Sequence, residues 1–209
     1  MVEKQLFERL KRLQRPVEIR RFDVLADAVA DIATREARAA DTFVGLRPDG
    51  KGTAREPEHL VEGILFGSGR HLVLVPPEQE SRMPFKHVVV AWNGSREAAR
   101  GLAESLPYCY QADTVTVIVV VDENEVELDS VLGVDAVNHL KHHGVNASLL
   151  HARRGTRRVG ATLIAEAQQG NADLIVTGGY GHSRLREWLL GGVTYELLHN
   201  APVPLLIAH

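Results

Sequence analysis

Five short apolar runs alternate with stretches of helical spacing in residues 87–208, and this alternation limits the fold more than any other feature. Each run is rich in β-branched residues and apolar almost throughout, which is typical of strands buried on both faces of a parallel sheet. The alternation predicts a doubly wound α/β structure. The expected strands are 87–92, 114–121, 147–152, 173–178 and 203–208, and the expected helices are 95–111, 128–143, 156–170 and 182–200. Ser95 is a plausible N-cap of the first helix.

The N-terminal part of the chain, residues 1–77, repeats part of this pattern. "AADTFVGLRP" (39–48) resembles "NADLIVTGGY" (171–180), and "ILFGSGRHLVLV" (64–75) resembles "LLHNAPVPLLIA" (197–208). Position 39 corresponds to position 171 and position 64 to position 197, so the offset between the two copies is nearly constant. A nearly constant offset indicates an internal duplication.

The first copy is shorter than the second. It offers an opening helix, a strand at 17–21, helices at 24–39 and 57–66, and strands at 42–46 and up to Val75. It has no counterpart of the first two strands of the second copy. The segment between the copies, 76–85, is polar and proline-rich, as linkers often are. We therefore predict a truncated half-domain in 1–77 and a complete domain in 84–209.

The missing half of the first copy has consequences for assembly. An uncovered apolar strand edge favours aggregation, so we expect the final strands of the two copies, Leu72–Val75 and Leu205–Ile207, to pack together. Two missing strands also leave apolar surface near 17–21 without cover. Either a homodimer supplies that cover, or Met1 is not the natural start and a longer protein exists.

Composition restricts the classes of function. The 209 residues are 44% hydrophobic and 24% charged, which is ordinary for a soluble globular protein. The formal charge of −3 gives no general attraction to nucleic acid or anionic membrane. The single cysteine, Cys109, excludes an intrachain disulfide and suits a reducing cytoplasm. The N-terminus lacks a signal-peptide pattern and no apolar run is long enough to span a bilayer, so we expect a cytoplasmic protein.

Two glycine clusters follow the fourth of the five expected strands. Gly178 and Gly181 precede a nine-residue spacer, and Gly191 and Gly192 follow it, with Val193 and Thr194 next. A loop between a buried strand and a helix is where open α/β sheets bind ligands. Glycine leaves backbone N–H groups uncovered, and a helix N-terminus attracts anions, so the pattern suits phosphate. The alternative is a tight turn and a helix break without any ligand, and spacing alone does not decide between them.

Gly178-x-x-Gly181, nine residues and then Gly191 resembles the nucleotide-binding signature of the universal stress protein family. "NAPVPLLIAH" (200–209) resembles the closing strand of that family, and "VVVAWNGS" (88–95) resembles its first strand and loop. The resemblance covers 84–209 and, more weakly, 1–77, where it is similar to the family's tandem arrangement. It implies a parallel five-stranded sheet in the order 3-2-1-4-5, flanked by helices and preceded here by a partial second copy of the same fold.

The resemblance also implies an adenine nucleotide site. Gly178, Gly181 and Gly191 match the glycines that hold phosphates, Val193 and Thr194 follow them, and Val120 lies where the second strand ends against the base. The sequence departs from the family at two positions.

The family usually has Ser or Thr where this chain has Gly192, and its first loop often carries Asp where this chain has Asn93. Loss of a hydroxyl donor to phosphate costs about tenfold in affinity. Residues 45–62 of the first copy keep no comparable glycine spacing, so we expect no nucleotide there.

Three functions remain open. The first is a regulator, similar to universal stress proteins, that binds ATP or a related adenine nucleotide in its C-terminal domain. The second is an interaction module without nucleotide, favoured by Gly192 and Asn93, and the third is a weak ATP-hydrolysing enzyme. We assign no catalytic residue, because no pair of nucleophile and base can be read from the sequence. His139, His142 and His143 have a spacing that could bind a metal, but a solvent-exposed helix face is the better interpretation without nearby acidic or cysteine partners.

Overall fold

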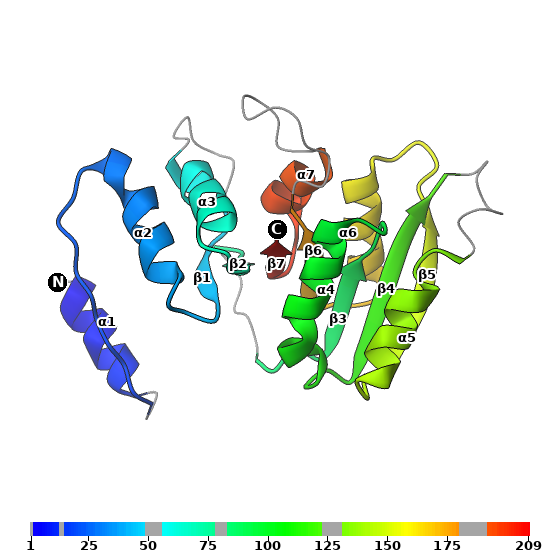
Figure 1. Ribbon diagram of the computed structural model, residues 1–209, viewed down its shortest axis with the longest axis horizontal. Coiled ribbons are helices and arrows are strands. Elements are labelled where there is room, and N and C mark those ends of the chain that lie inside the picture. Colours follow the sequence, from blue (N-terminus) through cyan, green and yellow to red (C-terminus); the bar gives the residue numbers. More distant parts are fainter. Residues whose placement is uncertain (1, 13–14, 49–55, 78–82, 123–130, 180–191) are drawn as a thin grey trace.

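The computed structural model describes residues 2–12, 15–48, 56–77, 83–122, 131–179 and 192–209. Its centre is one sheet of seven strands in the order β1-β2-β7-β6-β3-β4-β5, with helices packed against it (Figure 1). The strands are β1 (Phe43–Leu46), β2 (Leu72–Val75), β3 (His87–Ala91), β4 (Thr114–Val121), β5 (Ala147–Arg153), β6 (Leu174–Gly178) and β7 (Leu205–Ala208). The helices are α1 (Val2–Lys11), α2 (Val29–Ala37), α3 (Glu56–Gly67), α4 (Arg96–Cys109), α5 (Val134–His142), α6 (Val159–Gln169) and α7 (Gly192–Asn200), with a short 3-10 turn, η1 (Ala26–Ala28), before α2.

The five strands of residues 84–209 run parallel in the order third, second, first, fourth, fifth along the chain. This is the order that the family resemblance implies. Alternate residues of β3 face opposite sides: Val88 packs with α4 and α5, whereas Val89 packs with α6 and α7. Helices on both faces make the sheet doubly wound, as the alternation of strands and helices predicts.

The sheet continues from this unit into residues 1–77 through β2. β2 pairs with β7 in antiparallel orientation, with Leu72 opposite Ile207 and Leu74 opposite Leu205. The expected packing of the two final strands is thus confirmed. β1 then pairs with β2 in parallel orientation and forms the end of the sheet. Ile64 of α3 lies in the same buried cluster as Leu205, so one core runs across both parts of the chain.

Three expected elements differ from the structure. The strand at 17–21 was wrong: residues 16–25 form no regular element, because no described strand pairs with them to bond their backbone. The helix expected over 24–39 is shorter, since α2 begins only at Val29 after η1. α5 begins at Val134, directly after Gly133, whose φ of +94° lies in the left-handed region and does not continue a helix. The positions 128–130 and 182–191 of the expected helices lie outside the described residues.

A polar cluster joins residues 1–77 to α4. His71, 5% exposed, places Nδ1 2.9 Å from Glu104 Oε2 and Nε2 2.9 Å from Thr42 Oγ1. Because a carboxylate only accepts hydrogen bonds, Nδ1 donates to Glu104, while Nε2 shares a hydrogen bond with the Thr42 hydroxyl. The Tyr108 hydroxyl lies 3.2 Å from the same Thr42 oxygen. These contacts bring β1, β2 and α4 together at one point.

We predict that His71→Ala lowers the free energy of unfolding by about 2 kcal/mol, because it leaves the Thr42 hydroxyl and the Glu104 carboxylate without their central partner. Urea denaturation measures the change. His142→Ala is the control, since His142 is exposed on α5, and should have little effect. Equal unfolding curves for the two variants would show that the cluster contributes nothing to the junction.

Candidate functional site

The candidate site lies at the carboxyl edge of the parallel strands. β3 and β6 are neighbours in the sheet. The helix that follows β3 in the chain, α4, packs on one face of the sheet, whereas α7, which precedes β7, packs on the other face. Such a switch point opens a crevice at the carboxyl ends of the strands, which is where open α/β sheets bind ligands. β6 and β7 are parallel, so α7 must begin at this same edge (Figure 1). The fold thereby brings together the loop with Asn93, the end of β6 at Gly178 and the start of α7 at Gly192.

The loop after β3 is a tight turn that starts α4. The Ser95 backbone N–H donates to Asn93 Oδ1 at 3.1 Å, and the Ala98 N–H donates to Ser95 Oγ at 3.1 Å. Ser95 is therefore the N-cap of α4, as expected. Gly94 between them has a φ of +73°, a conformation that favours glycine. The exposed Asn93 side chain uses its oxygen in the turn, so its amide NH2 group is the part that could donate to a ligand.

Gly178 allows α4 to pack closely on β6. A Cβ atom at this position would lie 2.4 Å from the backbone carbon of Glu97 and 2.5 Å from the nitrogen of Ala98. Gly101 makes a second close approach from the helix side, where a Cβ would lie 3.1 Å from the Thr177 carbonyl oxygen. Gly178 therefore has a packing role that the sequence pattern did not distinguish from a phosphate-binding role.

The first residue of α7 meets no other part of the chain that the structure describes. Gly192 is exposed, and a Cβ there would meet no atom of the described residues within 4 Å. Val193 is half-buried against the main core, and Thr194 is 5% exposed, so the Thr194 side chain is directed into the protein. The first backbone N–H groups of a helix have no partner inside the helix. The α7 backbone, more than the Thr194 hydroxyl, is what this end offers to an anion.

Val120 lies one residue before the end of β4, the neighbour of β3 on its other side. It is half-buried and packs against the cluster on the α6 and α7 face, so it adds an apolar side chain near the same edge. Gly181 and Gly191 lie outside the described residues. The structure therefore gathers Asn93, Val120, Gly178 and the first turn of α7 at one edge, and leaves the middle of the glycine pattern undescribed.

A charged hollow beside this edge was missed by the sequence analysis. Arg96, Glu97, Arg100 and His209 line a volume of about 360 Å³. Glu97 is 4% exposed, and the hydrogen bond from Arg96 lowers its pKa. His209 donates from Nδ1 to the Gly179 carbonyl oxygen at 2.9 Å. The sequence gives no signal for this group, because His209 reaches α4 only through the pairing of β7 with β6.

The α5 histidines lie on an exposed face. The His139 and His143 rings are 4.6 Å apart between centroids, and His143 Nδ1 lies 3.0 Å from the Tyr110 hydroxyl. Within the described ranges, no group of three or more His, Cys, Asp or Glu residues could hold a metal ion. None of the helices in those ranges is long and apolar enough to cross a bilayer.

The sequence of residues 84–209 matches the family model described as "Universal stress protein family". This chain belongs to the universal stress protein family. The match covers the five-stranded unit and every residue of the candidate site. No curated protein matches the chain in a sequence search.

Solved universal stress proteins share the fold at low sequence identity. A universal stress protein from Archaeoglobus fulgidus DSM 4304 is 17% identical with a TM-score of 0.66, over 86% of this chain and 66% of its own. A putative universal stress protein from Pseudomonas aeruginosa UCBPP-PA14 is 14% identical with a TM-score of 0.65, over 99% of this chain and 77% of its own. A third, from Archaeoglobus fulgidus, is 18% identical with a TM-score of 0.51, over 59% of this chain and 98% of its own. This chain thus spans about two thirds of the first structure and nearly the whole of the third.

We predict that Gly178→Ala destabilises the protein by about 1–3 kcal/mol, because the added methyl group forces α4 away from β6. Gly192→Ala is the matched control: its methyl group enters open space, and alanine in a helix is favoured over glycine by about 0.5–1 kcal/mol. Thermal unfolding of the two variants checks this. If Gly178→Ala unfolds at the wild-type temperature, the close approach of α4 is not a constraint on the site.

Proposed function

We propose that this universal stress protein binds ATP or a related adenine nucleotide at the carboxyl edge of its C-terminal domain and acts as a regulator in the cytoplasm. The observation that carries the proposal is the open first turn of α7 at Gly192, next in the chain to the glycine pattern and at the same edge as the loop after β3. Family membership supports the proposal, since the glycine pattern lies in the matched residues.

The site residues would each bind a different part of the nucleotide. Phosphates are held by backbone N–H groups at the start of α7 and in the glycine loop, where the helix dipole favours negative charge. The Asn93 amide donates to a ribose hydroxyl or phosphate oxygen, and the Val120 side chain packs against the base. The Arg96 side chain lies exposed at the rim of the charged hollow and adds a cation at the same edge.

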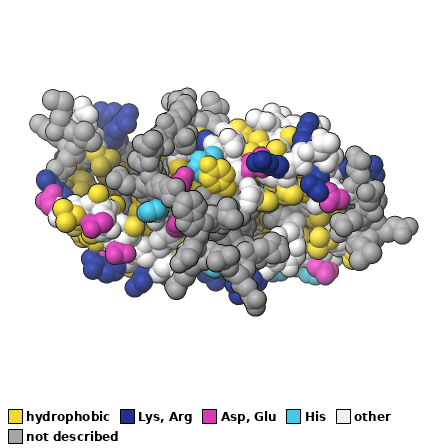
Figure 2. All heavy atoms as spheres, turned by 90° about the horizontal axis from the view of Figure 1, so that it is seen from above, with side chains coloured by type: hydrophobic (Ala, Val, Ile, Leu, Met, Phe, Trp, Pro, Cys, Tyr) yellow, Lys and Arg dark blue, Asp and Glu magenta, His cyan; other side chains and the backbone are white. Residues whose placement is uncertain are grey.

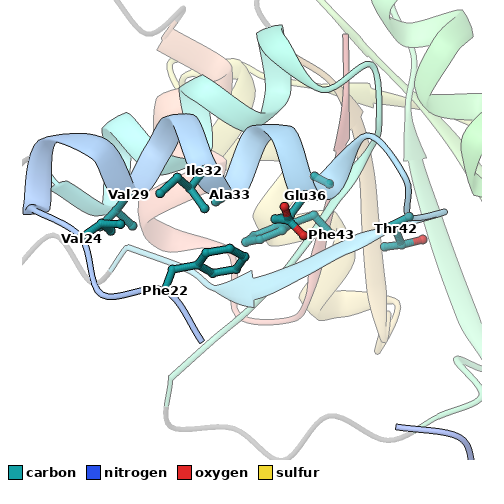
Figure 3. Close-up of a pocket in the computed structure, with 10 residues that line it drawn as sticks. Phe22, Val24, Val29, Ile32, Ala33, Glu36, Thr42 and Phe43 are labelled. Carbon is teal, nitrogen blue, oxygen red and sulfur yellow. The ribbon is translucent and has the colours of Figure 1, made fainter. Parts of the chain in front are cut away.

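Among the described residues, one arrangement is similar to the catalytic groups of hydrolases, but its surroundings do not suit catalysis. Thr42, His71 and Glu104 form a hydroxyl–imidazole–carboxylate chain with two separations of 2.9 Å. A nucleophile must reach its substrate, but His71 is buried, and the Thr42 hydroxyl points away from the apolar pocket that Phe22 and Phe43 line (Figure 3). We therefore interpret this chain as a structural contact and propose no catalytic residue.

The binding test uses two substitutions at the same position. Gly192→Ser supplies the hydroxyl that the family usually has, and we expect it to raise the affinity for ATP about tenfold. Gly192→Asp places a carboxylate there, which should abolish ATP binding by repulsion while it suits the helix N-terminus and keeps the fold intact. Isothermal titration calorimetry with ATP measures both, and thermal unfolding confirms that both variants fold.

Gly181→Val, at a glycine of the family pattern, should also abolish binding by blocking close approach of the phosphates. Identical titration curves for the wild type, Gly192→Asp and Gly181→Val would remove this site. If no protein in the set binds ATP and none releases bound nucleotide on denaturation, the interaction module without nucleotide is the correct function.

A further inference from the structure

α3 and α7 lie side by side on the face of the sheet opposite to α4 (Figure 1). Ile64 of α3 and Leu197 of α7 belong to one buried cluster, so this contact joins residues 1–77 to the C-terminal domain. His199, in the last turn of α7, places its side chain at the same contact, where it is only 8% exposed. A buried imidazole needs partners for its ring nitrogens.

Both nitrogens of the His199 ring face groups that only accept hydrogen bonds. Nδ1 lies 2.8 Å from the Tyr195 carbonyl oxygen, one turn earlier in α7, and Nε2 lies 3.0 Å from Glu58 Oε1 in α3. A neutral imidazole has one N–H group and donates once, whereas imidazolium donates from both nitrogens. The arrangement therefore requires one proton more than a neutral ring and an ionised carboxylate hold together.

His71, on the other face of the sheet, has no such requirement. Its Nδ1 donates to Glu104, but its Nε2 lies against the Thr42 hydroxyl, which can either donate or accept. Both histidines tie residues 1–77 to the C-terminal domain. Of the two contacts, the one made by His199 depends on an added proton.

The charged groups around the His199 ring come from three segments. Glu58 of α3 favours a protonated ring, and so does the carboxyl end of α7, because a helix C-terminus attracts a cation. Arg47, which follows β1, acts in the opposite direction: its Nη1 donates to the Leu198 carbonyl oxygen at 3.1 Å and brings a positive charge to the same turn of α7. The direct contact with Glu58 is the closer of these charged contacts to the ring.

The other titratable side chains of α7 do not supply this proton. The Tyr195 ring packs on the His199 ring at 4.1 Å between centroids, and the Glu196 carboxylate is directed to Gly160 of α6 instead. On the face of the molecule seen from above, the described acidic and basic side chains are interspersed (Figure 2). Exposed charges of mixed sign largely cancel and are screened by salt, so the direct contacts of the ring decide its protonation.

We propose that the His199–Glu58 contact is a pH-dependent link between α7 and α3, made while the pair holds its added proton and broken when rising pH removes it. The sign follows from proton linkage. The native pair binds a proton that a histidine of the unfolded chain releases near neutral pH, so the contact contributes its full stability in acid and loses it as pH rises. Without that proton, the Nε2 lone pair faces the Glu58 carboxylate and repels it. The link is independent of the proposed nucleotide site.

Hydrogen-exchange protection factors of the α3 amides test the link at pH 6 and pH 8. Because each factor is a ratio to the unfolded rate at the same pH, the two conditions can be compared directly. We expect the protection of α3 in the wild type to fall about tenfold between pH 6 and pH 8, as a hydrogen bond to a charged group is lost.

Two variants remove the titration without removing the contact. In His199→Gln the amide NH2 group donates to Glu58 at every pH, and in Glu58→Gln the amide accepts from a protonated ring or donates to a neutral one. Both should keep the protection of α3 nearly constant between pH 6 and pH 8. His142→Gln, at an exposed position of α5, is the matched control and should show the fall of the wild type.

The nitrogen-15 shifts of the His199 ring report the proton itself. We expect both ring nitrogens to carry protons at pH 6, and the loss of the Nε2 proton to occur over the same pH range as the fall in protection of α3. A ring that is neutral at pH 6 overturns the proposal. So does a ring that loses its proton while the protection of α3 stays unchanged, or a fall in protection that persists in both His199→Gln and Glu58→Gln.

Discussion

The antiparallel pairing of β2 with β7 is the interaction on which the rest of the structure depends. It places Leu72 opposite Ile207 and converts the edge of a five-stranded parallel sheet into the interior of a seven-stranded one. β7 thereby gains neighbours on both sides, and its four residues are all buried. On its other side β7 pairs with β6, and this pairing places His209 beside Gly179, next to the candidate site. The His71 cluster holds the junction from the α4 side.

Packing and binding make competing demands on the glycines of the candidate site. Gly178 is needed where α4 meets β6, whereas Gly192 is needed by no contact with the described residues. Glycine is less favourable than alanine in a helix, and no contact among the described residues requires it at Gly192. The family usually has a hydroxyl side chain there, so a phosphate bound at the start of α7, as we propose, would have one side-chain donor fewer in this chain. Nucleotide binding of lowered affinity is the consequence that we expect.

The strands of residues 84–209 could be predicted because runs such as "TVTVIVVV" are apolar on both faces, and that pattern fits only a covered sheet. The prediction of a strand at 17–21 was wrong. Alternating apolar and polar residues favour an extended backbone, but a strand also needs a neighbouring strand to pair with. We predicted the β2–β7 pairing because an uncovered apolar strand edge favours aggregation, and the structure confirms this pairing. The charged hollow with His209 and the His71 cluster were not predictable, because each joins residues far apart in sequence through strand pairing.

Backbone amide chemical shifts during titration with ATP test the central claim most directly, because they show where on the chain a nucleotide binds. The account predicts one ATP per chain, with the largest shifts at Gly192 and Val193 in the first turn of α7 and at Asn93 in the loop after β3. The amides of β1 and β2 should not move. Shifts confined to residues 1–77, or none at millimolar ATP, would contradict it.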